Sequence, residues 1–579
     1  MRTQATGAVD DLLERGLDLV ARRNFEGAFV AYRQAIDLAP DDPRGHMLLG
    51  AALSEHGTAD EAVAELELAA DLAGPLCDET WALYNNLANA LRRAERYDGA
   101  EQILLELTKF APKEWQPWHN LGQLYRDTKR NDEAAAALRR AIALAPDFAP
   151  NHALLGAVLH QLDRLHSADA AFNRAFALGY DDDPNMWTLY GNNCRFLARR
   201  DDCIAALERA LEMQPGSPPA YSNLASIKTT CGRFAEARTL IDRAVELEPE
   251  NSLWRANRGF MLLTSGDLDQ GWTDWEFAVQ NGTRGNERPL DVPRWTPEHP
   301  DARVMVYREQ GVGDEILFAS CYGDLIDCAR DVVIECTDRL LPLFARSFPG
   351  AEVREQSWKA GLGETKNDVD MALPSGSLPQ HFRPTVSSFS GERRSFLVPD
   401  AAKVEKWRAR FAAFGQGAVV GMSWRSKLTT AERRLEYTRL ADDWGPLFAV
   451  EGVHWVNLQY DDCERQLRDA EAQYGVTVHR WADVDYMNDF DEVAAIMAAC
   501  DLVVAPRNAV AMLAGALGVP TVMMGNRWDW ADLGTDTSPW FPSVEIAYRH
   551  FGEEWNEVIA TAARRVAAVA AGAGSATRD

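Results

Sequence analysis

Residues 307–319, YREQGVGDEILFA, decide how the C-terminal half of this chain folds. An apolar run at residues 304–306 precedes them and a segment with helical apolar spacing follows, so the pattern predicts a strand, a glycine turn and the start of a helix. Gly311 and Gly313 would let a ligand approach the backbone closely. Asp314 then falls in the first helical turn, at the rim where open α/β sheets bind ligands. We therefore expect a ligand site around this turn.

Apolar β-like runs alternate with helical patterns on the C-terminal side of the turn. Together with the run before the turn, they cover residues 304–307, 332–335, 370–373, 419–423, 453–458, 502–504 and 521–524. Such alternation predicts a mainly parallel sheet with both faces covered. A helical pattern at residues 401–414 separates two sets of runs. The expected fold class of this half is α/β, with two Rossmann-like lobes, residues 303–400 and 401–579, and a cleft between them.

The N-terminal half repeats. Small residues recur at equivalent positions, namely Ala28, Ala62, Ala100, Ala134, Ala168, Cys203, Ala237 and Gly271. A spacing of about 34 residues is typical of tetratricopeptide repeats, in which each copy is a helical hairpin that buries its apolar face by stacking on its neighbours. We predict that residues 1–280 form an α solenoid of about eight repeats. Residues 281–302, rich in Gly, Pro and charge, are predicted to be the linker.

The first helix of each hairpin is expected to line the concave face of the solenoid. Asn86, Asn120, Asn223 and Asn257 share the sixth position of their repeats. Because a side-chain amide both donates and accepts hydrogen bonds, a ladder of them would hold the backbone of a protein partner without reading its side chains. The alternative is that these amides only satisfy local polar groups.

Composition excludes several classes of function. The formal net charge is -27 at pH 7, which argues against general binding to nucleic acid or to an anionic membrane. The nine cysteines form no CxxC pair and lie beside no His at zinc-ligand spacing, so we expect neither a metal site nor a disulfide framework. There is no N-terminal apolar signal segment and no run of membrane-spanning length, so we expect a cytoplasmic protein.

The glycine turn fits neither common phosphate-binding fingerprint, because GxGxxG fails at its last glycine and no GK[ST] follows. It resembles the glycine-aspartate turn of bacterial heptosyltransferase-like enzymes, which have two Rossmann-like lobes in the GT-B arrangement. The resemblance implies that Asp314 is the base that deprotonates an acceptor hydroxyl, with Gln310, Gly311 and Gly313 on the acceptor side. Glu315 is an alternative base. An aspartate that only favours the helix dipole is the structural alternative for Asp314.

A cationic segment follows the first predicted strand of the second lobe. It contains Trp424, Arg425 and Lys427, and cations at the carboxyl end of a strand are well placed to bind a nucleotide phosphate. In the transferases that the chain resembles, this position contacts the donor phosphate. Arg433 and Arg434, further along, are interpreted as surface charge.

A helix of small residues is predicted to start at the end of a later strand, where its amides and its dipole can receive a phosphate. The segment resembles the donor-site helix of the heptosyltransferase-like family, but Arg507, Asn508 and Ala509 stand where an Asp-Thr pair is usual. The added cation and the lost acid imply a donor that is more anionic than a neutral sugar nucleotide.

The order of solenoid and lobe pair resembles bacterial flagellin glycosyltransferases that add nonulosonic acids, such as pseudaminic acid, to Ser or Thr. The resemblance implies that the repeats recruit flagellin in the cytoplasm and that the lobes transfer the sugar from a CMP-linked donor, with no further cofactor and no metal. Two alternatives stay open. One is transfer of another nucleotide-linked sugar, such as N-acetylglucosamine, to a different protein. The other is a non-catalytic repeat adaptor with a degenerate transferase domain.

Overall fold

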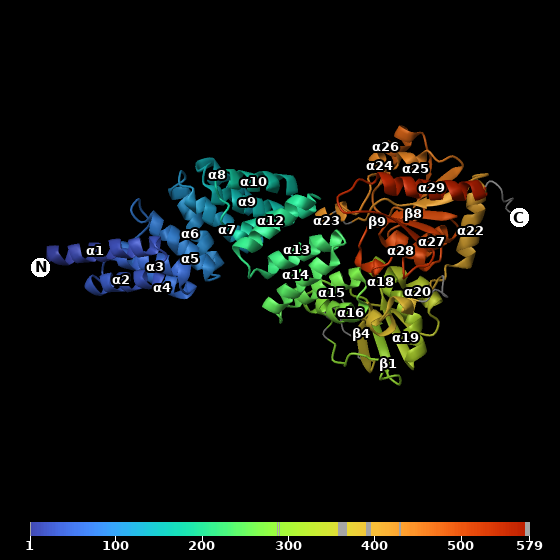
Figure 1. The fold of residues 1–579 in the computed structure, drawn as a ribbon, viewed down its shortest axis with the longest axis horizontal. Helices are drawn as coiled ribbons and strands as arrows, with labels where there is room; N and C mark the ends of the chain where they lie inside the picture. The colour runs from blue at the N-terminus through green and yellow to red at the C-terminus, as the bar shows by residue number, and fades with distance from the viewer. Residues whose placement is uncertain are drawn as a thin grey trace. The chain divides into compact units, whose positions relative to one another are not determined.

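The computed structural model describes residues 2–285, 288, 290–356, 368–389, 395–427 and 430–573 (Figure 1). The chain forms two compact units, Met1–Asn193 and Cys194–Asp579. The division falls within the repeats and not at the predicted linker near residue 281. The last repeats therefore belong to the same compact unit as the sheets.

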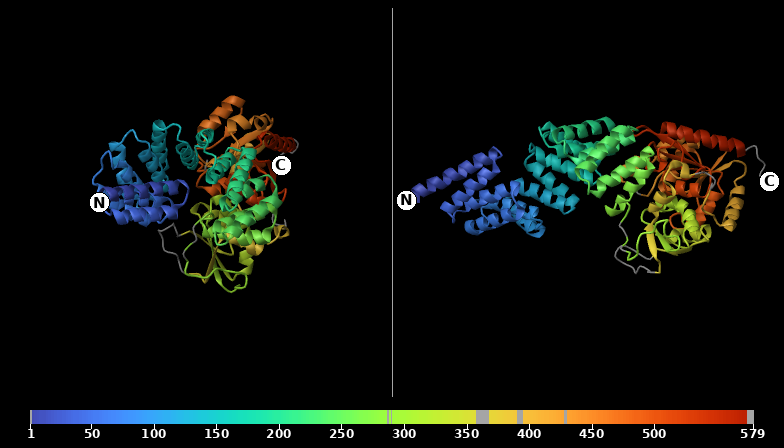
Figure 2. Two further views of the ribbon diagram at one scale, coloured as in Figure 1. Left: turned by 60° about the vertical axis from the view of Figure 1, so that its left-hand side comes forward. Right: turned by 60° about the horizontal axis from the view of Figure 1, so that its bottom comes forward.

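Within the described residues, helices α1 to α10 pair into five helical hairpins and α13 to α16 pair into two more, which confirms that the N-terminal part of the chain consists of helical repeats. Successive hairpins of the N-terminal unit lie side by side (Figure 2). Its helices are α1 (Arg2–Ala21), α2 (Phe25–Leu38), α3 (Pro43–His56), α4 (Ala59–Ala73), α5 (Trp81–Arg93), α6 (Tyr97–Phe110), α7 (Gln116–Asp127), α8 (Asn131–Leu144), α9 (Ala149–Gln161) and α10 (Leu165–Ala177), and α11 (Pro184–Phe196) contains the division between the units.

The helices of one hairpin pack closely because small residues face each other. Ala134 and Ala168, at the recurring position, have no exposed surface. On the facing helix, a Cβ added to Gly122 would lie 2.6 Å from Leu138 Cγ, so no larger residue fits there without a shift. The repeat spacing is therefore a packing requirement. No described helix is long and apolar enough to cross a membrane.

The C-terminal unit begins with repeat helices, which precede its two sheets in the chain. Its repeat helices are α12 (Arg200–Met213), α13 (Pro218–Thr230), α14 (Phe234–Leu247), α15 (Ser252–Ser265), α16 (Leu268–Trp275) and the short α17 (Phe277–Gln280).

The first sheet is parallel, with strand order β3-β2-β1-β4. Its strands are β1 (Arg303–Tyr307), β2 (Asp331–Cys336), β3 (Glu352–Glu355) and β4 (Met371–Pro374), and its helices are α18 (Val312–Phe318), α19 (Tyr322–Cys328), α20 (Leu341–Ser347) and α21 (Leu378–Phe382). The strand, glycine turn and helix expected around residues 304–319 are thus confirmed as β1 and α18. β3 was not predicted, because this edge strand has exposed ends and only partly buried central residues.

The second sheet is also parallel, with strand order β10-β9-β8-β5-β6-β7. Its strands are β5 (Ala418–Met422), β6 (Val453–Asn457), β7 (Val478–His479), β8 (Leu502–Pro506), β9 (Thr521–Asn526) and β10 (Val544–Arg549). Its helices are α22 (Ala401–Ala412), α23 (Ala431–Arg434), α24 (Leu440–Asp443), α25 (Gly445–Phe448), α26 (Glu464–Tyr474), α27 (Phe490–Ala498), α28 (Ala509–Ala516) and α29 (Asn556–Ala573). The sequence did not predict the edge strands β7 and β10, which lack a continuous apolar run.

Alternate residues of the central strands point to opposite faces of this sheet. Val420 and Val504 pack with α29 on one face, whereas Val419 and Val503 pack with α27 and α28 on the other. Figure 1 shows α29 and the pair α27 and α28 on opposite sides of β8 and β9. Burial on both faces explains why these strands read as continuous apolar runs.

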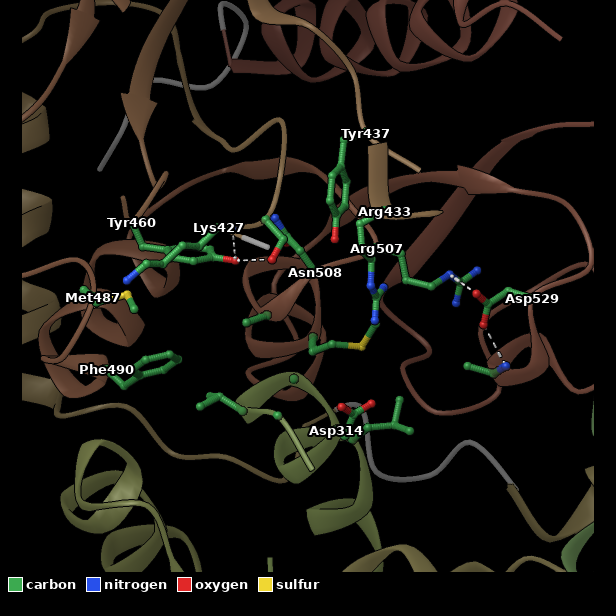
Figure 3. Close-up of a pocket in the computed structure, with 18 of the residues that line it drawn as sticks. Asp314, Lys427, Arg433, Tyr437, Tyr460, Met487, Phe490, Arg507, Asn508 and Asp529 are labelled. Carbon is green, nitrogen blue, oxygen red and sulfur yellow. Dashed lines mark hydrogen bonds and ion pairs between the residues drawn. The ribbon is translucent and has the colours of Figure 1, made fainter. Parts of the chain in front are cut away.

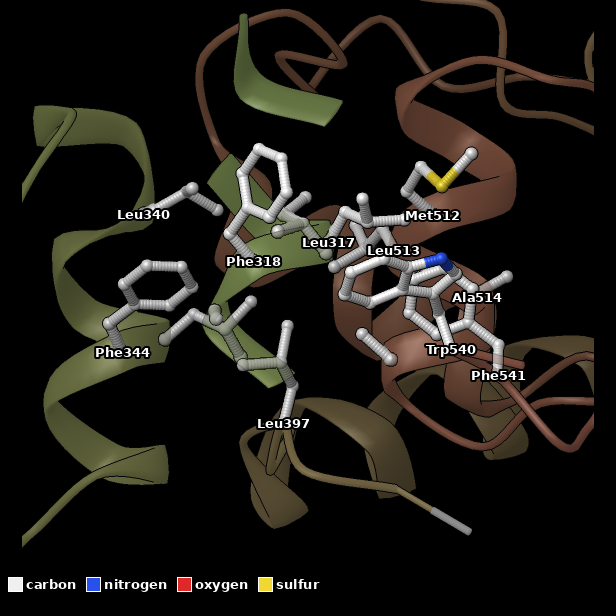
Figure 4. Packing of buried hydrophobic residues seen from close by; sticks show 14 of the residues in the cluster. Leu317, Phe318, Leu340, Phe344, Leu397, Met512, Leu513, Ala514, Trp540 and Phe541 are labelled. Atoms are coloured by element: carbon white, nitrogen blue, oxygen red, sulfur yellow. The ribbon is translucent and has the colours of Figure 1, made fainter. Parts of the chain in front are cut away.

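One apolar core joins the two sheets and the last repeat. Leu317 and Phe318 of α18 lie in the same cluster as Met512 and Leu513 of α28 (Figure 4). Trp275, from the last repeat, belongs to this cluster, and its indole donates a hydrogen bond of 2.8 Å to the carbonyl of Gly376. The last repeat is therefore built into the first lobe.

The described part of segment 281–302 is packed and does not form a free linker. Arg284 has no exposed side-chain surface and is ion-paired with Glu309, directly before the glycine turn, and with Glu276 of the last repeat. Trp295 is also fully buried. Composition indicated an exposed linker, but partners from elsewhere in the unit cover these side chains.

Candidate functional site

A cavity of about 440 Å³ lies between the glycine turn and the carboxyl ends of strands in the second sheet. The turn contributes residues 311–314, and α23, the loop after β5 and the start of α28 contribute the facing side. In Figure 3 the Asp314 carboxylate points from the first lobe toward Arg433 and Arg507 of the second. The structure thus brings together segments that are far apart in sequence.

Asp314 lies in the first turn of α18 and lines the cavity. Its side chain is enclosed on most sides, and this burial raises the pKa of its carboxyl group above the ordinary value. The nearby Arg433 guanidinium acts in the opposite direction and lowers the pKa of Asp314. A carboxylate with a raised pKa is a stronger base, so the geometry suits proton abstraction from a group in the cavity.

Glu315, the alternative base, points away from the cavity. It is 1% exposed, its Oε1 accepts a hydrogen bond of 2.9 Å from the Thr337 amide, and its Oε2 lies 3.1 Å from Arg308 Nε. Burial raises its pKa to about 7. Because Glu315 does not line the cavity, the hypothesis that it serves as the base is wrong for this structure.

Of the acceptor-side residues, Gly311 and Gly313 line the cavity, whereas Gln310 does not. A Cβ on Gly313 would lie 3.6 Å from Ala509 Cα, an ordinary contact distance, so the starts of α18 and α28 lie next to each other across the cavity. The carbonyl of Gln310 accepts a hydrogen bond of 2.8 Å from Arg308 and helps to hold the turn.

The cationic segment after β5 divides into residues that reach the cavity and residues that do not. Lys427 lines the cavity. Trp424 has no exposed surface, because it packs in the core of the second lobe. Arg425 is ion-paired with Asp461, and its guanidinium donates a hydrogen bond of 3.0 Å to Gln466. The structure therefore corrects the sequence interpretation, since Trp424 and Arg425 shape the loop and do not line the site.

The start of α28 is partly satisfied by the protein itself. Asn508 Oδ1 accepts hydrogen bonds from the amides of Val510 (3.0 Å) and Ala511 (3.2 Å), so these two amides already have a partner. Arg507 lines the cavity, but its guanidinium is 2.7 Å from Asp532 and 3.4 Å from Asp529. The predicted phosphate site at these amides is therefore weaker than the sequence indicated, although Arg507, Asn508 and Ala509 all line the cavity.

Arg433 and Tyr437 are cavity residues that sequence reasoning missed. Arg433 had been interpreted as surface charge, and its Nη1 does pair with Glu436 at 2.8 Å. Its position at the end of the four-residue helix α23, facing α18, makes it part of the site. Both residues follow the cationic segment at residues 424–427 in the chain, and their local spacing does not distinguish them from surface residues.

The cavity is more cationic than the chain as a whole. Among its described lining residues, the cationic side chains are Arg339, Lys427, Arg433 and Arg507, and the anionic ones are Asp314 and Asp529. Tyr437, Tyr460 and Phe490 add aromatic surface. Glu436 pairs with Arg433 and Asp532 with Arg507, so in a protein with a formal net charge of -27 it is Arg339 and Lys427 that most favour an anionic ligand in this cavity.

The four predicted ladder asparagines do not act alike. Asn120 Nδ2 donates to Asn85 Oδ1 of the preceding repeat at 2.9 Å, and Asn257 Nδ2 donates to Ser222 Oγ at 2.9 Å. These two amides therefore link neighbouring repeats, which agrees with the alternative that they satisfy local polar groups. Asn86 and Asn223 are partly exposed.

Comparison with known proteins identifies the helical hairpins as tetratricopeptide repeats. Tetratricopeptide repeat models match residues 13–75, 81–107, 116–148 and 199–258. Protein FlbA of Caulobacter vibrioides is 30% identical over 428 residues, which cover 65% of this chain and 72% of that protein. The chain belongs to the FlbA family. Because the repeats end at Gln280, before the middle of the chain, a match of this extent includes part of the sheet region.

Solved structures of other proteins match part of this chain. The crystal structure of MamA protein matches at 24% identity with a TM-score of 0.27, over 30% of this chain and 94% of that one. The Cut9-Hcn1 hetero-tetramer of the APC/C matches at 15% identity with a TM-score of 0.39, over 46% of this chain and about half (52%) of that one. At these TM-scores the likenesses carry no functional argument.

Proposed function

We propose that this member of the FlbA family is a glycosyltransferase that moves an acidic sugar from a nucleotide-linked donor to a hydroxyl group of a protein. The observation that carries the proposal is the pairing of Asp314, a carboxylate made more basic by burial, with cations across one cavity. The GT-B arrangement of the two parallel sheets is part of the proposal.

The reaction follows from this arrangement. Asp314 takes the proton of the acceptor hydroxyl while the oxygen attacks the anomeric carbon of the sugar. The bond between that carbon and the donor phosphate breaks, and the phosphate leaves with the electron pair. Lys427 and Arg433, which line the cavity, are the residues proposed to stabilise the negative charge that grows on the leaving phosphate.

The anionic character of the donor sugar has its own support. A nucleoside monophosphate leaving group needs few cations, yet Arg339 also lines the cavity, as does Arg507, which is paired with Asp529 and Asp532. A sugar carboxylate would account for a further cation, because guanidinium groups bind carboxylates in a bidentate manner. A CMP-linked nonulosonic acid such as pseudaminic acid has both groups.

The proposed acceptor is a Ser or Thr of flagellin, modified in the cytoplasm. Tetratricopeptide repeats indicate a role in protein interaction. The choice of flagellin as the acceptor rests on the resemblance of residues 309–319, 424–427 and 506–520 to flagellin glycosyltransferases.

The test is reconstitution with purified chain, unpolymerised flagellin and CMP-pseudaminic acid, read by intact mass. Transfer should add whole sugar masses. Asp314→Asn should lower the rate by about 10²–10⁴-fold, because general-base catalysis contributes about that much, while CMP binding measured by calorimetry stays. Equal rates for Asp314→Asn and the unaltered chain would contradict the role of Asp314.

The adaptor alternative has one observation in its favour, since Asn508 and Arg507 already have partners within the protein. An adaptor would bind neither CMP-linked nor diphosphate-linked sugars. The same calorimetry therefore separates the adaptor from the enzyme, and the mass of the added group separates pseudaminic acid from N-acetylglucosamine.

A further inference from the structure

A second cavity, of about 690 Å³, lies between the last repeats and the second lobe. Helices α13 and α15 form one wall, and the loop after β9, with Trp528 and Trp530, contributes to the other. All of its lining residues belong to the C-terminal compact unit.

Close packing holds these two walls together. Trp528 meets Phe234 at 4.9 Å between ring centroids, and Trp530 meets Trp275 of the last repeat at 4.8 Å. A Cβ added to Gly534 would lie 2.8 Å from the backbone nitrogen of Gly266, so the two backbones nearly touch. The cavity is therefore a fixed feature of the unit.

The second cavity meets the Asp314 cavity. Arg433, Asp529 and Trp530 line both. A chain that lies along α13 and α15 would reach Asp314 after passing these three side chains. Arg339 and Lys427 line the Asp314 cavity and not the second one, so the second cavity approaches Asp314 from the side of the repeats.

The lining of the second cavity suits a polypeptide backbone. On α13 it presents Asn223, Ser226 and Thr230, and on α15 it presents Asn257 and Thr264. The Thr230 and Thr264 hydroxyls donate to carbonyls of their own helices, at 2.8 and 2.7 Å, and keep lone pairs as acceptors. The Asn223 amide supplies a donor as well as an acceptor, and Asn257, whose Nδ2 already donates to Ser222 Oγ, supplies its carbonyl oxygen as an acceptor. A helical partner would need a continuous apolar stripe, which this lining of amides and hydroxyls interrupts.

We propose that this second cavity, named the acceptor groove, binds an extended segment of the protein acceptor and delivers its Ser or Thr hydroxyl to Asp314. The inference rests on the proposed function and adds to it. It makes α13 to α15 part of the transferase itself, distinct from the repeats of the N-terminal unit. It also requires the modified segment to be unfolded when it is bound.

Ser226→Trp tests the acceptor groove, because Ser226 is exposed on α13 and an indole there would fill the groove without disturbing the core. We expect kcat/KM for unpolymerised flagellin to fall by about tenfold or more, while CMP binding by calorimetry is unchanged. Thr239→Trp, on the exposed face of α14 and outside the groove, is the matched control and should transfer as the unaltered chain does.

The outcomes are distinguishable. Undiminished transfer by Ser226→Trp would overturn the acceptor groove and leave the proposed function intact. Loss of CMP binding in Ser226→Trp, with Thr239→Trp normal, would assign this cavity to the donor and also overturn it. If the unaltered chain and both variants all fail to modify flagellin, the proposed function fails first, and the groove proposal with it.

Discussion

The buried ion pair before the glycine turn gives a stability prediction of known sign. Arg284 has no exposed side-chain surface, and its partner Glu309 is 4% exposed. Arg284→Met removes the charge and keeps much of the volume, so the Glu309 carboxylate stays buried with the Gly376 amide, at 3.0 Å, as a remaining donor. Removing one member of a buried pair costs about 3–5 kcal/mol, and we expect a loss of that order in the free energy of unfolding at pH 8.

The loss should depend on pH. Burial raises the pKa of Glu309, and Arg284 opposes that rise. Without Arg284 the folded-state pKa rises further above the unfolded value of about 4.3, so the folded variant holds its proton more tightly than the unfolded chain does. The added penalty is absent below the unfolded pKa and grows as pH rises toward the folded pKa. The deficit relative to the unaltered protein should therefore be smaller at pH 5 than at pH 8.

Urea denaturation at pH 5 and pH 8, followed by tryptophan fluorescence, measures the loss of unfolding free energy and its dependence on pH. The matched control is Arg294→Met, because Arg294 pairs with Glu276 of the same cluster but is 43% exposed. An exposed pair contributes about 0–1 kcal/mol, so the control should lose little. The reasoning would be refuted if Arg284→Met lost no more stability than Arg294→Met, or if its deficit were the same at both pH values.

Two further predictions concern the site and the division of the chain. Arg433→Gln should raise the pKa of Asp314, because the Arg433 guanidinium lowers that pKa. The acidic limb of the pH–rate profile for transfer should therefore move to higher pH. A limb that stays at the same pH would contradict the electrostatic interaction between Arg433 and Asp314. A fragment of residues 194–579 should show a cooperative unfolding transition in calorimetry. A fragment of residues 281–579 should lack this transition, because it loses Trp272 and Trp275 from the shared core. Equal cooperativity of the two fragments would show that the last repeats are dispensable for folding.

Local patterns predicted those parts of the fold that depend on the periodicity of buried side chains. The change from a run of apolar residues to helical spacing across Gly311 predicted β1 and α18. The recurrence of small residues predicted the helical hairpins. Short edge strands carry no such periodicity, so β3, β7 and β10 could not be predicted, and a burial pattern like that of β10, with exposed and partly exposed residues, does not distinguish a strand from a loop.

The candidate site shows the same limit at the level of single residues. Trp424, Arg425 and Lys427 are near neighbours in sequence, and their type and position after a strand indicated one role for all three. In the structure Trp424 lies in the core, Arg425 is ion-paired with Asp461, and Lys427 lines the cavity. Side-chain direction and the presence of a partner from a distant segment decide which of these outcomes occurs, and neither is encoded in local spacing.

The sequence by itself determined the repeats, the parallel sheets and the placement of Asp314 in the first turn of a helix, because each depends on residues close together in the chain. Only the tertiary structure decided that Arg433 faces Asp314, that Glu315 is buried away from the cavity, and that the last repeats share a core with the lobes. Each of these depends on packing and charge between segments that are distant in sequence, where burial and low dielectric set both the direction of a side chain and the pKa of its acid.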